Sequence, residues 1–160
     1  MSRDKVVQQI FLKACRLCAR QEKAPSQIHQ KLLHYGATAE EADELLTKLQ
    51  REGFVDVDRF TRAYVSDKFR FNKWGKIKIA YQLRGIGIAE ETVAQAMTLL
   101  DPVEYEAVAR HVAKAKFTGL GAHLSPLERQ KKTLDFLRGR GFEFDLAKKI
   151  SSNLSFPEQS

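Results

Sequence analysis

The residues best suited to chemistry in this chain are two cysteines and two histidines near its beginning. Cys15-x-x-Cys18 followed by His29-x4-His34 supplies four zinc ligands at a spacing close to that of a zinc finger. A zinc finger needs its cysteines on a hairpin, however, and the segment 6–19 has the apolar periodicity of one helix. We therefore predict reduced cysteines on a helix and no bound metal, and we keep a zinc-dependent adaptor as an alternative.

No catalytic constellation can be assembled from the other candidates. The four histidines are scattered, and the chain has neither an HExxH motif nor a phosphate-binding loop. Asp56 and Asp58 could form a carboxylate pair, but acids beside the start of a helical pattern are ordinary capping residues. The sequence therefore predicts a protein that is not an enzyme and needs no cofactor.

Positive charge is concentrated in the segment 59–84. It holds eight Lys/Arg residues and one acid, Asp67, and eight minus one equals the +7 net charge of the whole chain. Like charges on consecutive helices repel one another by about 0.2–0.5 kcal/mol per i,i+4 pair, and an acidic partner relieves that repulsion. We predict a functional basic surface, against the alternative of a merely solvated face. Its residues are Arg59, Arg62, Arg70, Lys73, Lys76, Lys78 and Arg84.

Large apolar side chains recur at helical spacing in the same segment. On the first expected helix Phe71 shares a side with Phe60 and Tyr64. Such residues usually pack in a core, so we predict buried positions for several of them. These are Phe60, Tyr64, Trp74, Ile77 and Tyr81.

Composition restricts the remaining possibilities. We expect no signal peptide and no membrane span, because no apolar run approaches the required length. A pI near 9.5 favours an acidic partner such as nucleic acid, a nucleoprotein or an acidic protein surface. We expect a cytoplasmic protein.

Apolar residues recur with helical periodicity throughout the chain. The pattern of residues around Gly36 appears again around Gly87 and Gly141, at intervals of 51 and 54 residues. Each glycine falls where a helix ends in a left-handed residue. Apolar residues align around the glycines at −4, +1 and +6. These residues are Leu32, Leu83, Leu137; Ala37, Ile88, Phe142; Ala42, Val93, Ala147. We predict an all-α fold of three tandem three-helix units, 1–54, 55–103 and 104–160, in an elongated, curved array.

Capping residues mark several helix starts. Thr38 and Glu41 form one capping-box pattern, and Ser125 and Glu128 form another. Asp56 is the expected N-cap of the first helix in the basic segment.

The segment 83–89, with glycines at 85 and 87, also resembles the hairpin of helix-hairpin-helix DNA-binding proteins. The repeat offers a simpler explanation, since Gly87 is the helix end shared by all three units. The DNA hairpin remains an alternative.

The segment 53–60, GFVDVDRF, is similar to the G-[LF]-[IV]-D-D-x-R-F signature of the RecX family of bacterial regulators of the RecA recombinase. The likeness covers about the whole length and includes the three tandem units. Val57 stands where the family commonly has a second Asp, and Thr61 where Ala is usual. We expect Thr61 to face solvent. Further matching positions are Ala63, Tyr64, Val65, Gly75, Lys76, Ile79, Leu83, Gly87 and Ile88.

The resemblance implies a regulator without catalytic activity. It would bind the RecA filament on single-stranded DNA and inhibit its extension, ATPase and strand exchange, modulating recombination, DNA repair and the SOS response. We expect a monomer with weak direct binding to DNA. The alternative is a non-specific DNA-binding protein that grips phosphates with the basic helices of the middle unit.

Overall fold

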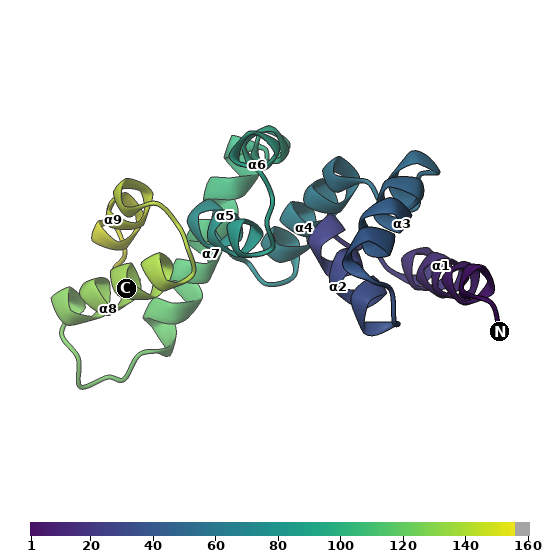
Figure 1. Cartoon of the computed structure of the whole chain (residues 1–160). Coiled ribbons are helices and arrows are strands. Elements are labelled where there is room, and N and C mark those ends of the chain that lie inside the picture. The colour runs from purple at the N-terminus through teal and green to yellow at the C-terminus, as the bar shows by residue number, and fades with distance from the viewer. Residues whose placement is uncertain (156–160) are drawn as a thin grey trace. The chain divides into compact units, whose positions relative to one another are not determined.

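The computed structural model describes residues 1–155, and within them the chain forms nine α-helices and no β-strand (Figure 1). The predicted all-α fold is confirmed. The helices are α1 (Arg3–Arg20), α2 (Pro25–His34), α3 (Ala39–Arg51), α4 (Val57–Arg70), α5 (Lys76–Gly85), α6 (Glu90–Met97), α7 (Pro102–Gly119), α8 (Pro126–Gly139) and α9 (Phe144–Ser152).

The predicted caps begin the helices. The Thr38 hydroxyl accepts a hydrogen bond from the backbone amide of Glu41 at 3.1 Å, and the Glu41 carboxylate accepts one from the backbone amide of Thr38 at 2.9 Å. Ser125 and Glu128 form the same reciprocal pair before α8. The Asp56 carboxylate accepts an amide of the first turn of α4 at 3.0 Å, which lowers its pKa.

The three aligned glycines end α2, α5 and α8 in the left-handed conformation. Their φ angles are +106° at Gly36, +91° at Gly87 and +96° at Gly141. The residue after each glycine donates its amide at 3.0 Å to a carbonyl five residues earlier, as in a Schellman motif. These pairs are Ala37 to Leu32, Ile88 to Leu83 and Phe142 to Leu137, and all six side chains are buried. The repeat seen in the sequence is therefore a repeated helix ending.

By its internal contacts the chain divides into two compact units. The amino-terminal unit comprises Met1–Tyr64 and Leu83–Ala96, and the carboxy-terminal unit comprises Val65–Gln82 and the chain from Met97 onward. The three unit boundaries expected from the sequence, and the elongated, curved array, stay predictions.

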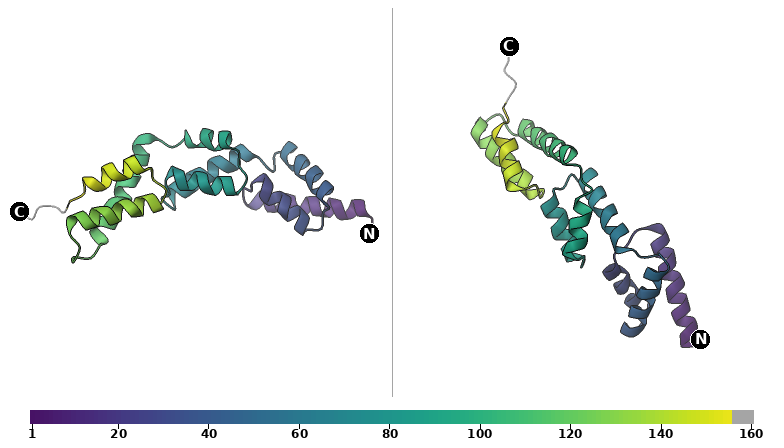
Figure 2. Two further views of the ribbon diagram at one scale, coloured as in Figure 1. Left: turned by 60° about the vertical axis from the view of Figure 1, so that its left-hand side comes forward. Right: turned by 90° about the horizontal axis from the view of Figure 1, so that it is seen from above.

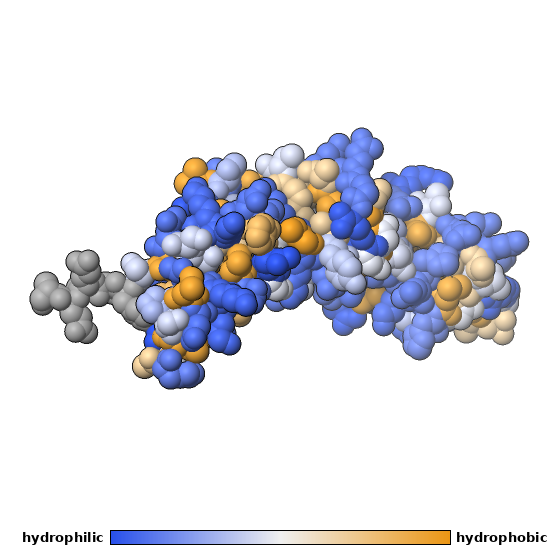
Figure 3. Space-filling view, turned by 90° about the vertical axis from the view of Figure 1, so that its left-hand side faces the viewer, coloured by the Kyte–Doolittle hydropathy of each residue, from blue (hydrophilic) through white to orange (hydrophobic). Residues whose placement is uncertain are grey.

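Each unit contains a group of three mutually packed helices. In the amino-terminal unit α1, α2 and α3 pack together, and the stripe expected on 6–17 places Ile10, Phe11 and Ala14 in their core. In the carboxy-terminal unit α7, α8 and α9 do the same (Figure 2). Figure 3 looks toward the side of α7, α8 and α9; the visible surface is mostly hydrophilic, with apolar side chains in separate small patches.

The packing predicted for α5 is wrong. Ile77 and Tyr81 are 55% and 69% exposed, whereas Ile79 and Leu83 are fully buried. Residues two apart on a helix point about 200° apart, so burying Ile79 and Leu83 turns Ile77 and Tyr81 outward. Phe71 is also exposed, at 80%, because α4 ends at Arg70 before reaching it.

Of the burial predictions for Phe60 and Thr61 on α4, one is confirmed and the other is wrong. Phe60 is buried, as predicted. Thr61 is also fully buried, so the expectation that it faces solvent is wrong. Its hydroxyl donates to the Val57 carbonyl at 2.7 Å, and this bond allows a polar side chain to occupy the interior.

Candidate binding surface

The turn between α4 and α5 holds a lysine in an unfavourable conformation. Within residues 1–155, Lys73 is the one non-glycine residue with a positive φ, +55°. For a residue with a Cβ, left-handed backbone costs about 1–2 kcal/mol. The four other left-handed positions found in the same range hold glycine. Strain of this kind at a surface turn suggests that the lysine side chain has a role.

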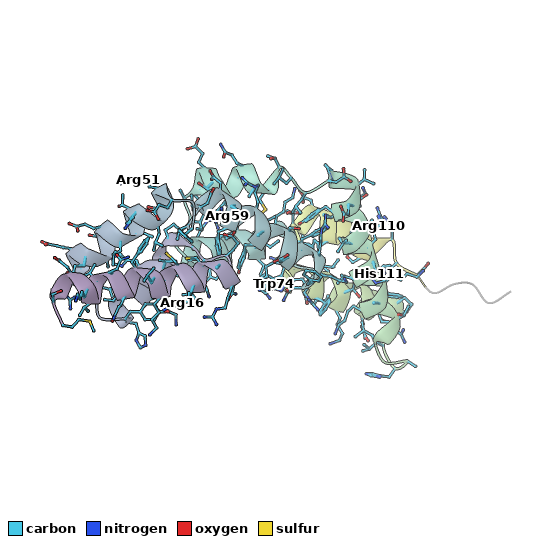
Figure 4. The ribbon with its side chains drawn as sticks, turned by 90° about the vertical axis from the view of Figure 1, so that its right-hand side faces the viewer. Arg16, Arg51, Arg59, Trp74, Arg110 and His111 are labelled. Atoms are coloured by element: carbon cyan, nitrogen blue, oxygen red, sulfur yellow. The ribbon has the colours of Figure 1, made fainter. Side chains whose placement is uncertain are left out.

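Trp74, which Figure 4 labels, lies half-buried in this turn, and two lysine side chains lie over its ring. The Nζ atoms of Lys68 and Lys78 lie 5.0 and 4.6 Å from the Trp74 ring centroid. Each contact is a cation–π interaction worth about 0.5–1 kcal/mol at an exposed site. Lys68 was not among the predicted site residues. Residues six apart do not share a face of a helix, so the sequence pattern could not predict this contact with Trp74, which the turn after α4 creates.

The backbone amides at the amino terminus of α5 donate hydrogen bonds to residues of other segments instead of to a capping side chain next to α5. The amide of Gly75 donates to the Arg140 carbonyl at 2.8 Å, and that of Ile77 donates to the Gly141 carbonyl at 3.0 Å. Between them, the amide of Lys76 donates to the Tyr105 hydroxyl at 3.0 Å. The carbonyls of the two residues that follow α8 thus accept hydrogen bonds from amides at the start of α5, which have no partner within their own helix.

Two glycines permit this close approach. A Cβ on Gly75 would overlap the backbone of Gly141, and a Cβ on Gly141 would overlap Lys78. A related contact occurs in the amino-terminal unit, where the Ser26 hydroxyl donates to the Ile86 carbonyl in the turn that ends α5. Gly141 therefore serves both as the left-handed end of α8 and as a contact point for α5, whereas in the turn after α5 these roles fall to Gly87 and Ile86.

Tyr105 secures the same junction from α7. It is 5% exposed, and its hydroxyl donates to the Glu143 carboxylate at 2.9 Å while it accepts the amide of Lys76. Burial raises the pKa of Tyr105, so its phenol stays protonated as a donor. Its ring packs on those of Phe69 and Phe142, with centroids 5.7 and 5.4 Å away.

Four predicted site residues belong to the carboxy-terminal unit. Arg70 and Lys73 lie at the end of α4 and in the following turn; the Lys76 Nζ lies 4.8 Å from the Tyr105 ring centroid, and Lys78 lies over Trp74. Among the residues described, none of the four forms an ion pair with a carboxylate. Their positive charge remains available to a partner.

The other three predicted residues belong to the amino-terminal unit, and two of them have internal partners. Arg59 pairs with Glu22 and also donates to the Gly53 carbonyl at 3.1 Å. Arg84 pairs with Glu90, and this hydrogen bond raises the pKa of the guanidinium. The third, Arg62, is exposed on α4.

An exposed apolar stripe runs along the outer face of α5. Ile77 and Tyr81 stand at positions i and i+4 of α5, which share one face of the helix, and Trp74 lies half-buried in the turn just before it. We call these three residues, together with Lys68, Arg70, Lys73, Lys76 and Lys78, the α5 surface. Aromatic side chains within a polar rim are typical of protein–protein interfaces.

The zinc alternative finds no support in the geometry. Both cysteines lie on α1, and burial raises the pKa of each thiol, which disfavours the thiolate that zinc requires. The His29 Nε2 lies 2.9 Å from an Asp43 carboxylate oxygen. From Met1 to Ser155, no group of three or more His, Cys, Asp or Glu side chains could hold a metal ion. Over the same range, no helix combines the length and apolarity needed to cross a bilayer.

Protein-family comparison matches both later repeats. The model of the second three-helix domain of RecX matches residues 58–97, and that of the third matches residues 104–150. The regulatory protein RecX of Halorhodospira halophila is 31% identical over 134 residues, covering 82% of this chain and 80% of that protein. That of Pelodictyon phaeoclathratiforme is 29% identical over 131 residues, covering 82% and 79%.

Solved structures agree on the fold. The crystal structure of RecX from Lactobacillus salivarius matches with a TM-score of 0.84 at 17% identity, over 93% of this chain and 96% of that one. A second regulatory protein RecX matches with a TM-score of 0.83 at 21% identity, over 92% and 72%. Fold and sequence together define an all-α regulatory protein built from tandem three-helix domains. The chain belongs to the RecX family, as its signature segment predicted.

Proposed function

We propose that this protein binds the RecA filament on single-stranded DNA and inhibits its extension, ATP hydrolysis and strand exchange. It acts by binding, without catalysis, as a cytoplasmic monomer. The observation that carries the proposal is the α5 surface, where Ile77 and Tyr81 are more than half exposed beside several lysines. Apolar side chains provide binding energy when a partner covers them, and the cations raise the rate of encounter with an acidic filament.

The predicted site residues divide into two roles under this proposal. Arg62, Arg70, Lys73, Lys76 and Lys78 contact the partner directly. Arg59 and Arg84 support the folded structure and do not contact the partner, because their guanidinium groups form ion pairs with Glu22 and Glu90.

The test measures single-strand-dependent ATP hydrolysis by the cognate recombinase in the presence of substoichiometric amounts of this protein. Ile77→Ala/Tyr81→Ala should raise the concentration needed for inhibition about tenfold or more, because interface anchors contribute about 1–2 kcal/mol each. Lys73→Glu/Lys78→Glu should weaken inhibition and reduce its dependence on salt.

A matched control reverses two charges elsewhere in the same unit. Lys131→Glu/Lys132→Glu changes exposed residues of α8 and should leave inhibition unchanged. Equal inhibition by all variants would contradict the assignment of the α5 surface. Inhibition that appears only when the DNA is saturated, and disappears in modest salt, would favour the alternative of a non-specific DNA-binding protein.

A further inference from the structure

A second basic region lies in the amino-terminal unit, outside the segment that holds the chain's net charge. From Lys5 to Ala39, which includes most of α1 and all of α2, the sequence has six Lys/Arg residues and one acid, Glu22. That acid is already paired with Arg59. The following segment, 39–52, reverses the balance with five acids and two basic residues. The whole amino-terminal unit has 12 Lys/Arg and 11 Asp/Glu residues, so its net charge is only +1, although α1 and α2 are basic and α3 is acidic.

The cations of α1 line a groove. Lys13, Arg16 and Arg20 stand at i, i+3 and i+7, so they follow one face of α1 over about 10 Å. Tyr35, at the end of α2, forms part of the same groove, and the Lys13 Nζ lies 4.3 Å from its ring centroid. Arg16 and Arg20 are exposed, and within the described part of the chain neither forms an ion pair.

A second groove adjoins the first at the end of α2. The His34 and Tyr35 rings, one from each groove, have centroids 6.2 Å apart. The second groove is lined by Lys23, Gln27, Gln30, Lys31 and His34. It therefore supplies amide groups as well as cations. Figure 4 shows Arg16 of α1 and Arg51 of the acidic helix α3 on opposite sides of this unit.

We propose that these two grooves bind single-stranded nucleic acid. Lys13, Arg16 and Arg20 contact successive phosphates, while the Tyr35 ring stacks on an unpaired base. Basic grooves that combine cations with an aromatic ring are the usual means of holding single strands. The glutamine amides can donate to base edges or phosphates. This site shares no residue with the α5 surface and does not depend on the proposed inhibition of the recombinase.

The first test measures binding of the whole protein to a fluorescein-labelled oligothymidylate by anisotropy, across a series of salt concentrations. Arg16→Ala/Arg20→Ala should lower affinity about tenfold or more at low salt. The magnitude of the slope of log affinity against log salt should fall by about 1.4, since each phosphate contact on a single strand contributes about 0.7. Lys131→Ala/Lys132→Ala on α8 removes the same net charge and should have little effect. Equal losses in the two double variants, or no loss in either, would overturn the proposal.

The second test locates the base. An oligonucleotide containing 5-iodouracil should cross-link to Tyr35 on irradiation, and the peptide can be identified by mass spectrometry. Tyr35→Leu preserves apolar packing against the core and should abolish this cross-link while reducing affinity about fivefold or more. Cross-links confined to other segments would refute base stacking at Tyr35. If Arg16→Ala/Arg20→Ala weakened only inhibition of the recombinase and not oligonucleotide binding, the grooves would be a protein-binding surface and the proposal would be wrong.

Discussion

Gly75→Ala tests the contact that holds the start of α5. The added Cβ would overlap backbone atoms of Gly141 and Phe142. Gly75 does not have a left-handed backbone, so the substitution adds volume without a conformational penalty. Backbone atoms cannot rotate away as the end of a flexible side chain can. The segments must therefore separate.

The expected cost follows from the bonds that separation would stretch. The amides of Gly75, Lys76 and Ile77 each donate across this junction at 2.8–3.0 Å. A hydrogen bond contributes about 0.5–1.5 kcal/mol net, and overpacking costs about 1–3 kcal/mol. With partial relaxation, we expect the free energy of unfolding to fall by about 3 kcal/mol, which for a chain of this size lowers Tm by about 6–12 °C.

Urea denaturation followed by circular dichroism measures this loss, with Gly85→Ala and Gly139→Ala as controls. Both controls add the same methyl group at the last residue of a helix, where a Cβ has no atom within 4 Å. They should leave stability unchanged or raise it by up to about 1 kcal/mol. Hydrogen exchange at the Ile77 amide should accelerate only in Gly75→Ala. Equal stability of Gly75→Ala and Gly85→Ala would refute the proposed role of the junction.

Three further substitutions have expected outcomes. Gly87→Val should lower Tm more than Gly85→Val, because only Gly87 has a positive φ, +91°; equal values would contradict this. Lys73→Gly should raise the free energy of unfolding by about 1 kcal/mol and weaken recombinase inhibition, whereas unchanged inhibition would remove the functional reason for the strained lysine. The hydrogen bond from Arg3 lowers the pKa of Glu41 to about 2 from 4.5. The ionised Glu41 carboxylate therefore stabilises the folded state fully above pH 4.5, and this stabilisation is lost as the pH falls toward 2. Acid unfolding of Glu41→Gln should therefore depend less on pH in that range, and an unchanged profile would argue against the ion pair.

The sequence by itself determined the features that depend on neighbouring residues. Thr38 and Ser125 cap helices because their hydroxyls reach amides three residues along the same chain. Gly36, Gly87 and Gly141 adopt positive φ because a helix ending in that conformation favours the residue without a Cβ. The family signature likewise consists of local segments. For these reasons the all-α fold and the repeat were predicted from residue types and spacing, and the family from the resemblance of the segment 53–60 to a known signature.

Only the tertiary structure decided which charged and apolar groups remain available to a partner. Arg59 and Lys73 look alike in the sequence, yet Arg59 pairs with Glu22, 37 residues away, whereas Lys73 occupies a strained surface turn. Ile77 and Tyr81 fit an apolar helical stripe as well as Ile79 and Leu83 do. Periodicity identifies a face of a helix but not the face that packs, because burial depends on neighbours distant in sequence.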